Sequence, residues 1–194
     1  MQNSKKGIGK RVLRGRAGAG RHPPGLWVGG LSRANSRGWV GQGSSRFLCA
    51  LGRSGRQILK REGDGATPLG CYRLRQVYYR ADRLRRPQTS LPVRNLRPED
   101  GWCDAIGDRN YNRHVRHPYP ASAEMLWRDD ALYDLIVVLD QNERPRVRGG
   151  GSAIFLHIAR DGFRPTAGCV ALSRRDLLLL LQHAGPKTRI RVVR

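Results

Sequence analysis

The sequence predicts a mainly β protein, a sandwich or small barrel with one or two short helices. From Pro24 onward the apolar stretches are short and are separated by turns rich in Gly, Ser and Asn, which is typical of consecutive β-strands. A clear pair of start and stop signals marks a helix in a single segment, which begins at Ser173. Because strands and helices do not alternate along the chain, the pattern does not favour a parallel βαβ architecture.

The expected strands begin at the first apolar run and continue to the end of the chain. Residues 134–139 read Asp-Leu-Ile-Val-Val-Leu, an apolar run that predicts a buried strand. A further strand is expected to open at Cys169. The remaining predicted strands cover residues 26–30, 38–43, 46–51, 57–61, 70–79, 153–158 and 188–193.

Two segments are candidates for helices. Ser173 can cap a helix, Asp176 completes a capping-box pattern, and Gly185 with the following proline ends the segment. Residues 121–130 are expected to form a short helix with Met125 and Trp127 on its apolar side. Residues 80–120, rich in Arg, Pro, Asp and Asn, are expected to form a long loop region, and such loops on a rigid scaffold are often functional.

The charge of the chain is strongly positive and unevenly distributed. There are 37 Lys and Arg residues against 15 Asp and Glu residues, a net charge of +22. Such a field attracts polyanions such as nucleic acid, anionic lipid or acidic wall polymers. Codon bias toward arginine explains the composition equally well, so charge alone names no function.

The chain is expected to divide into a basic arm, residues 1–23, and one domain, residues 24–194. The arm holds seven basic residues and almost no large apolar side chains, which predicts disorder. It lacks the apolar stretch of about 7 to 15 residues of a secretory signal. No run of the chain approaches the roughly 18 to 20 apolar residues of a membrane span.

Four cysteines stand at positions 49, 71, 103 and 169. Their spacing contains no CxxC pair, so we expect no zinc site, and His114 and His117 are interpreted as surface-loop residues. In an oxidising compartment Cys71 and Cys103 could form a disulfide. Equally, both could be small buried apolar side chains.

The strongest chemical pattern lies in the last third of the chain. A strand delivers His157, and a Gly-Cys pair, Gly168 and Cys169, opens the next strand. Two adjacent strands joined by a hairpin could place the imidazole beside the thiol, as a cysteine nucleophile requires. The bare backbone at Gly168 could present amide groups to a substrate oxyanion. The alternative is a buried cysteine and a structurally satisfied strand histidine.

An ordered set of motifs resembles the YkuD-type L,D-transpeptidase catalytic domain. In that family a strand His is followed by a loop and then by Ser/Thr-His-Gly-Cys and an apolar residue. Here the corresponding residues are His157, Thr166, Gly168, Cys169 and Val170. Residues 63–70 resemble the Thr-Pro-x-Gly strand lead-in of the family, and residues 49–55, 101–104 and 151–157 resemble one compact branch of it. The resemblance therefore covers most of the chain after Pro24.

The resemblance implies a YkuD-like fold and a chemistry. Cys169 would be the acylated nucleophile and His157 its base and acid, and the backbone amides of Ala167, Gly168 and Cys169 would form the oxyanion hole. The implied substrates are peptidoglycan stem peptides, joined in 3→3 cross-links through a thioester, with no metal and no organic cofactor. The cell envelope or periplasm is then the expected location, and the basic surface would hold the protein on an anionic wall polymer.

The sequence departs from the family pattern at several positions. Ala167 stands where the family has a second histidine, Ile158 follows the strand histidine, and Ala171 stands two residues after the cysteine. Substrate recognition is therefore expected to differ. If His157 is the partner of Cys169, the thiol should have a depressed pKa and react fastest with alkylating agents.

Three further residues are candidates for substrate binding. Thr166 belongs to the cysteine motif, and Trp102 and Tyr111 could line the donor cleft. The favoured alternative for Trp102 and Tyr111 is that they are anchors of the core.

Other functions remain to be weighed against the transpeptidase. The same Cys–His site would act as an L,D-carboxypeptidase or endopeptidase if water attacks the thioester. A papain-like hydrolase is disfavoured, because there the Cys precedes the His, whereas His157 precedes Cys169. A basic nucleic-acid-binding module would require stacking aromatics, yet aromatic residues make up only 7% of the chain and no RNP-like or zinc-finger pattern occurs.

Overall fold

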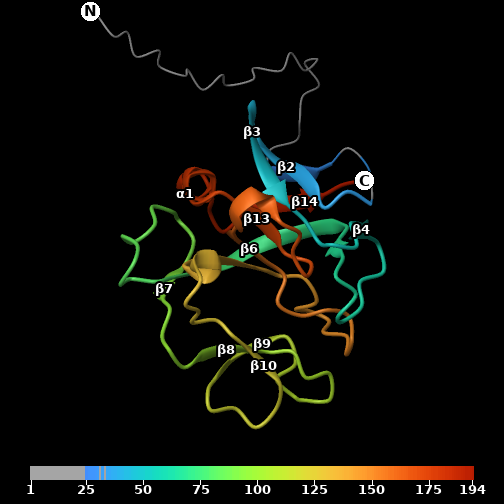
Figure 1. Cartoon of the computed structure of the whole chain (residues 1–194), viewed down its shortest axis with the longest axis vertical. Coiled ribbons are helices and arrows are strands. Elements are labelled where there is room, and N and C mark those ends of the chain that lie inside the picture. The colour runs from blue at the N-terminus through green and yellow to red at the C-terminus, as the bar shows by residue number, and fades with distance from the viewer. Residues whose placement is uncertain (1–24, 31, 33) are drawn as a thin grey trace, which may run out of the picture.

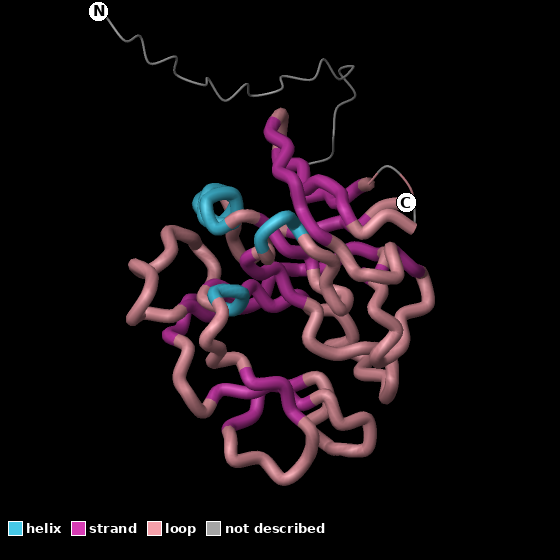
Figure 2. The backbone as a smooth tube through the Cα atoms, in the orientation of Figure 1, coloured by secondary structure: helices cyan, strands magenta, loops and turns pink. Residues whose placement is uncertain are grey.

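The computed structural model describes residues 25–30, 32 and 34–194 (Figures 1 and 2). The predicted basic arm, residues 1–23, lies outside this part of the chain. The mainly β fold is confirmed, since strands dominate and the described residues contain a single α-helix and two 3-10 turns. The helices are α1 (Arg174–Gln182), η1 (Ala131–Tyr133) and η2 (Asp161–Phe163). The strands are β1 (Leu26–Gly29), β2 (Arg37–Gln42), β3 (Ser45–Ala50), β4 (Arg56–Gln57), β5 (Thr67–Pro68), β6 (Gly70–Tyr79), β7 (Val93–Asn95), β8 (Asp100–Cys103), β9 (Arg113–Arg116), β10 (Ala123–Met125), β11 (Leu135–Leu139), β12 (Phe155–Ile158), β13 (Val170–Leu172) and β14 (Arg189–Val192).

The main sheet closes on itself like a barrel. Its strands follow the order β11-β12-β13-β3-β2-β1-β14-β6-β7, and a further pairing between β11 and β6 closes the ring, so that β7 is attached to β6 outside it. The long strand β6 makes this closure, because it pairs with β14 at its start and with β11 along its second half. Closure leaves few free sheet edges, which protects the strands from pairing with other chains.

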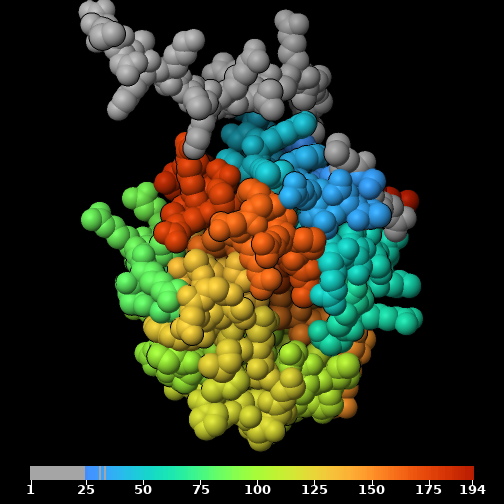
Figure 3. Space-filling model, viewed as in Figure 1, coloured from blue at the N-terminus to red at the C-terminus, as the bar shows by residue number. Residues whose placement is uncertain are grey.

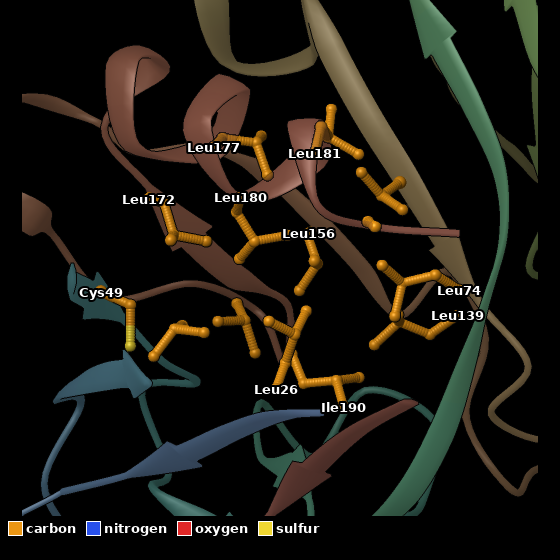
Figure 4. Close-up of a cluster of buried hydrophobic side chains, with 14 of the residues drawn as sticks. Leu26, Cys49, Leu74, Leu139, Leu156, Leu172, Leu177, Leu180, Leu181 and Ile190 are labelled. Carbon is orange, nitrogen blue, oxygen red and sulfur yellow. The ribbon is translucent and has the colours of Figure 1, made fainter. Parts of the chain in front are cut away.

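The interior of the barrel is filled by aliphatic side chains. Leu26, Leu74, Leu156 and Ile190, from four different strands, converge there in Figure 4 and are at most 2% exposed. Helix α1 adds Leu177, Leu180 and Leu181 from one of its faces. The side chains that point into this space come from alternate positions of each strand, as the pleat of a β-strand requires.

A second apolar layer covers part of the outer wall of the barrel. Along β11, Leu135, Val137 and Leu139 point inward, whereas Ile136 and Val138 belong to the second cluster. This strand is buried along its whole length because both of its faces are covered, as its continuous apolar run predicted. The outer cover includes the three-stranded sheet β10-β8-β9, which lies at one end of the molecule in Figure 1.

Helix α1 begins where its sequence signals predicted. Ser173 is the N-cap, and its hydroxyl accepts a hydrogen bond of 3.1 Å from the backbone N–H of Asp176. This bond satisfies one of the amide groups that a helix start leaves free.

The predicted helix over residues 121–130 is wrong. Residues 123–125 form β10 instead, which pairs with β8, and Glu124 lies opposite Trp102. A helix of so few residues is costly to nucleate. As a strand, the segment instead forms its backbone hydrogen bonds with the edge of β8. The residues expected on its apolar face are not buried together, since Met125 is 43% exposed and the ring of Trp127 is covered by the guanidinium of Arg80.

Two other expectations need correction. The strand predicted over residues 57–61 ends at Gln57, because the next residues form a turn in which the Arg61 N–H donates to the Asp64 carboxylate. The region 80–120 is not only loop, since it contains β7, β8 and β9. The buried carboxylate of Asp100 holds these short strands together through Arg94 and His114.

Candidate active site

His157 and Cys169 lie on the same face of two neighbouring strands. In the ladder between β12 and β13, Leu156 pairs with Val170 and His157 pairs with Ala171. Leu156 and Val170 point into the barrel, so the residues next to them, His157 and Cys169, face the outer layer. The two strands are parallel, which corrects the expected hairpin: the chain crosses over through η2 before it returns.

The thiol of Cys169 is held by backbone groups of the preceding strand. Its Sγ donates to the carbonyl oxygen of Ala153 at 3.1 Å and accepts from the N–H of Phe155 at 3.4 Å. Ala153 has a φ of +52°, a left-handed conformation that is uncommon for a residue with a Cβ. This conformation stores strain directly beside the thiol, as is often observed at functional sites.

The imidazole of His157 is fixed by its own strand. Its Nδ1 lies 2.8 Å from the carbonyl oxygen of Ile158, which can only accept a hydrogen bond, so Nδ1 carries the proton and Nε2 carries the lone pair. The ring of Tyr133 packs edge-on against the imidazole, with the ring centroids 5.3 Å apart. Nε2 is therefore the nitrogen that can take a proton.

In the resting protein the thiol and the imidazole are both neutral. Burial raises the pKa of the Cys169 thiol to about 12, and the charge of Glu124 acts in the same direction. Burial lowers the pKa of His157 to about 4. The expectation of a depressed thiol pKa is therefore wrong for the resting state, because removal of charge from water outweighs any attraction between thiolate and imidazolium.

The loop before Cys169 is closed by Thr166 and requires glycine at position 168. The Thr166 hydroxyl donates to the carbonyl oxygen of Cys169 at 2.7 Å and accepts from the N–H of Gly168 at 3.1 Å. Gly168 has a φ of +141°, and an added Cβ would lie 2.8 Å from the carbonyl oxygen of Ala66. The amide of Gly168, one of the three expected oxyanion donors, is thus engaged within the loop.

Cys169 and His157 line one cavity of about 790 Å³. Its walls come from the loop after β4, from β10 and the segment that follows it, and from the crossover between β12 and β13. These segments meet on the face of the molecule shown in Figure 3. Thr166 and Ala167 also line the cavity. The charged groups of its walls are Arg53, Lys60, Glu62, Asp104, Glu124, Arg128, Arg160 and Arg164.

The structure adds Glu124 and Tyr133 to the site, which sequence reasoning missed. The Tyr133 hydroxyl donates to Glu124 Oε1 at 2.7 Å, and the guanidinium of Arg128 lies 5.3 Å from the centre of the Tyr133 ring. Burial raises the pKa of the Glu124 carboxyl. Glu124 was assigned to a helix, and only the pairing of β10 with β8 shows which way its side chain faces.

Trp102 and Tyr111 do not line the cavity of Cys169, which contradicts their assignment to the donor cleft. Trp102 is 8% and Tyr111 is 1% exposed, which fits the alternative that they are core anchors. Trp102 packs edge-on against Phe155, and its indole N–H donates to Asn112 at 2.9 Å. Asn112 in turn accepts a hydrogen bond from the N–H of Ala153 at 3.2 Å. Trp102 therefore contributes to the site indirectly, through Asn112 and the backbone of Ala153.

Cys71 and Cys103 do not form a disulfide, and both are free thiols. Cys71 is exposed, contrary to the alternative that it is buried, whereas Cys103 is buried as that alternative predicted. His114 is part of β9, where its Nε2 lies 2.7 Å from Asp100. Within the described residues no group of three His, Cys, Asp or Glu side chains is placed to hold a metal ion.

Among the helices of the described chain, none is both long and apolar enough to cross a membrane. Neither the curated proteins nor the solved structures contain a match to the chain. A family model does match: the YkuD model, described as the L,D-transpeptidase catalytic domain, covers residues 32–192, which include His157 and Cys169. The chain therefore belongs to the YkuD family of L,D-transpeptidase catalytic domains.

Proposed function

We propose that the protein is a cysteine-dependent L,D-transpeptidase that acts on peptidoglycan stem peptides in cell-wall biogenesis. The observation that supports this proposal most directly is the placement of Cys169 and His157 on one face of neighbouring strands, in one cavity. Membership in the YkuD family supports acyl transfer as the general reaction. The cavity contains both acidic and basic side chains, which suits a peptide that carries amines and carboxylates.

In the proposed reaction, Cys169 Sγ attacks the carbonyl carbon of the third, diamino-acid residue of a tetrapeptide donor. His157 Nε2 takes the thiol proton as the C–S bond forms and passes it to the nitrogen of the terminal D-Ala, which leaves as the C–N bond breaks. An amine of a second stem peptide then attacks the thioester, loses its proton to His157 and releases the thiol. The product is a 3→3 cross-link.

The neutral resting pair fits this sequence of steps. A thiol that transfers its proton only as it attacks needs a base with a free lone pair, which Nε2 of His157 supplies. The amides of Ala167 and Cys169 belong to the loop that ends at the thiol, and in this proposal they donate to the oxyanion of the tetrahedral intermediate. Tyr133 and the backbone of Ile158 would hold the imidazole in place during both proton transfers.

Mass spectrometry of the intact protein after incubation with a tetrapeptide donor tests the proposal. We expect a mass increase equal to the tripeptide acyl group, with loss of D-Ala, and its absence in Cys169→Ala. The exposed Cys71 supplies a matched control, since Cys71→Ser should form the adduct normally. An unmodified parent protein, or an adduct that persists in Cys169→Ala, would contradict the proposal.

Analysis of the released products identifies the acceptor. A cross-linked dimer indicates transpeptidation. Free tripeptide without a dimer indicates that water attacks the thioester, and the same site would then be an L,D-carboxypeptidase.

The positive charge suggests how the enzyme stays near its substrate. We propose that it works in the cell envelope and that its basic surface, with a net charge of +22 in the whole chain, binds an anionic wall polymer. Retention on isolated sacculi should then decrease with increasing salt, and deletion of residues 1–23, which hold seven basic groups, should weaken it. Binding that is insensitive to both changes would contradict this part of the proposal.

A further inference from the structure

Glu124 is an acidic side chain without an ion-pair contact in a strongly basic protein. Within the described residues, no Lys, Arg or His nitrogen lies within ion-pair distance of its carboxylate. Burial raises the pKa of the Glu124 carboxyl and the charge of Arg128 acts against this, but the Arg128 guanidinium makes its hydrogen bonds of 2.7 and 2.8 Å to Asp130 rather than to Glu124. A partly buried carboxylate without an ion-pair contact is stabilised when a ligand supplies a cation.

The carboxylate is held in a fixed position in the cavity of the nucleophile. Glu124 belongs to β10, whose pairing with β8 sets the direction of its side chain, and the Tyr133 hydroxyl donates to Oε1. Tyr133 also contacts the imidazole of His157. Glu124 is thus connected through one side chain to the base, and it lines the same cavity as Cys169.

The charges around the thiol show what an unpaired carboxylate does there. The negative charge of Glu124 disfavours the thiolate of Cys169, and the positive charge of Lys60 favours it. Lys60 is neutralised locally by its ion pair with Asp64. His157 faces Arg128 and Arg160, which oppose its protonation, and Asp130, which favours it. Neutralisation of Glu124 would therefore ease deprotonation of the thiol.

We propose that Glu124 binds a primary ammonium group of the stem peptide, and that this contact releases Cys169 for attack. The inference rests on the transpeptidase function proposed above, because it assigns one substrate group to one residue of that site. A bound ammonium supplies the missing cation and cancels the charge that opposes the thiolate. The nucleophile is then activated in the presence of a peptide with a free amine and stays a protonated thiol in its absence.

The first test removes the charge of Glu124 and measures the thiol alone. In a Cys71→Ser background, iodoacetamide, a neutral reagent, should alkylate Cys169 at least about threefold faster at pH 8 in Glu124→Gln than in the parent. Glu143→Gln is the matched control, since it removes the same charge from the ion pair with Arg75, outside this cavity, and should leave the rate unchanged. Peptide mapping confirms which cysteine carries the label.

The second test identifies the amine. Thioester formation is measured with a tetrapeptide donor whose side-chain amine is either free or acetylated. In a separate assay, the rate of thioester transfer to an amine acceptor is measured relative to the rate of thioester hydrolysis. If the donor amine binds, acetylation and Glu124→Gln each slow acylation about tenfold or more, and their effects do not add. If the acceptor amine binds, acylation is normal but the KM for the acceptor increases about tenfold or more in Glu124→Gln.

Tyr133→Phe provides a second variant in case Glu124→Gln folds poorly. It keeps the ring against His157 but removes the hydroxyl that orients Glu124, so it should weaken the same amine dependence by a smaller factor. Normal acylation in the parent together with an amine dependence that is unchanged in both variants would overturn the inference, even if alkylation is faster. Absence of any thioester in the parent would instead overturn the proposed function.

Discussion

Alkylation of Cys169 tests the neutral thiol–imidazole pair without any substrate. Free cysteine titrates near about 8.5, so about a quarter of it is thiolate at pH 8. With the Cys169 pKa raised to about 12, the thiolate fraction at pH 8 falls to about one in ten thousand, roughly two-thousandfold lower. A more basic thiolate is also a better nucleophile, which recovers a factor of about 40. We therefore expect iodoacetamide to alkylate Cys169 about fiftyfold more slowly than a cysteine in a short peptide.

The assay is a pH series from 6 to 10 on a Cys71→Ser protein, with peptide mapping of the label. The rate at Cys169 should increase about tenfold per pH unit without a plateau across this range, because the thiol pKa lies above it. A plateau below pH 9, or a rate that exceeds that of the model peptide, would show a preformed thiolate–imidazolium pair. Such a result would refute the conclusion that burial dominates the charge state of the site.

Three further predictions concern stability. Gly168→Ala should destabilise the protein by about 2 kcal/mol and reduce thioester formation, because the new Cβ would meet the carbonyl oxygen of Ala66 at 2.8 Å; unchanged chemical denaturation would contradict this. Ser173→Ala should cost about 1 kcal/mol in the same experiment through loss of the bond to Asp176, and an unchanged midpoint would remove the cap from the account. Burial lowers the pKa of His157 from 6.5 to about 4. Between pH 6.5 and pH 4 the unfolded chain therefore binds a proton at this histidine that the folded chain does not bind. The free energy of unfolding is highest above about pH 6.5 and decreases with pH, by about 2.5 kcal/mol at pH 4.5. His157→Gln should lack this part of the pH dependence, and identical pH slopes for the two proteins would argue against a buried neutral histidine.

The sequence was sufficient to predict the elements whose signals are local. The apolar runs of β11 and β12 and the cap of α1 each depend on a few neighbouring residues. The same is true of the cysteine motif, since Gly168 and Thr166 act within three residues of Cys169. For these elements, local propensity and tertiary packing favour the same structure.

The features that the sequence did not predict depend on contacts between distant segments. The closure of the barrel requires β6 to pair with β11, about sixty residues away, and no local pattern encodes it. The strand β10 was assigned to a helix because its partner β8 lay in a region expected to be loop. The same error concealed Glu124, and the charge state of Cys169 could not be inferred, because burial is a property of the folded protein.

One face of β12 and β13 packs into the barrel core, and the other face carries the candidate site. Leu156 and Val170 help to fill the barrel, while His157 and Cys169, one residue away on the same strands, form the site. The strands cannot leave the barrel without separating the thiol from the imidazole. With the function proposed above, loss of activity and cooperative unfolding should be one event, so the activity that remains in a heated sample would count the folded molecules directly and could serve as a reporter for screens of thermal stability.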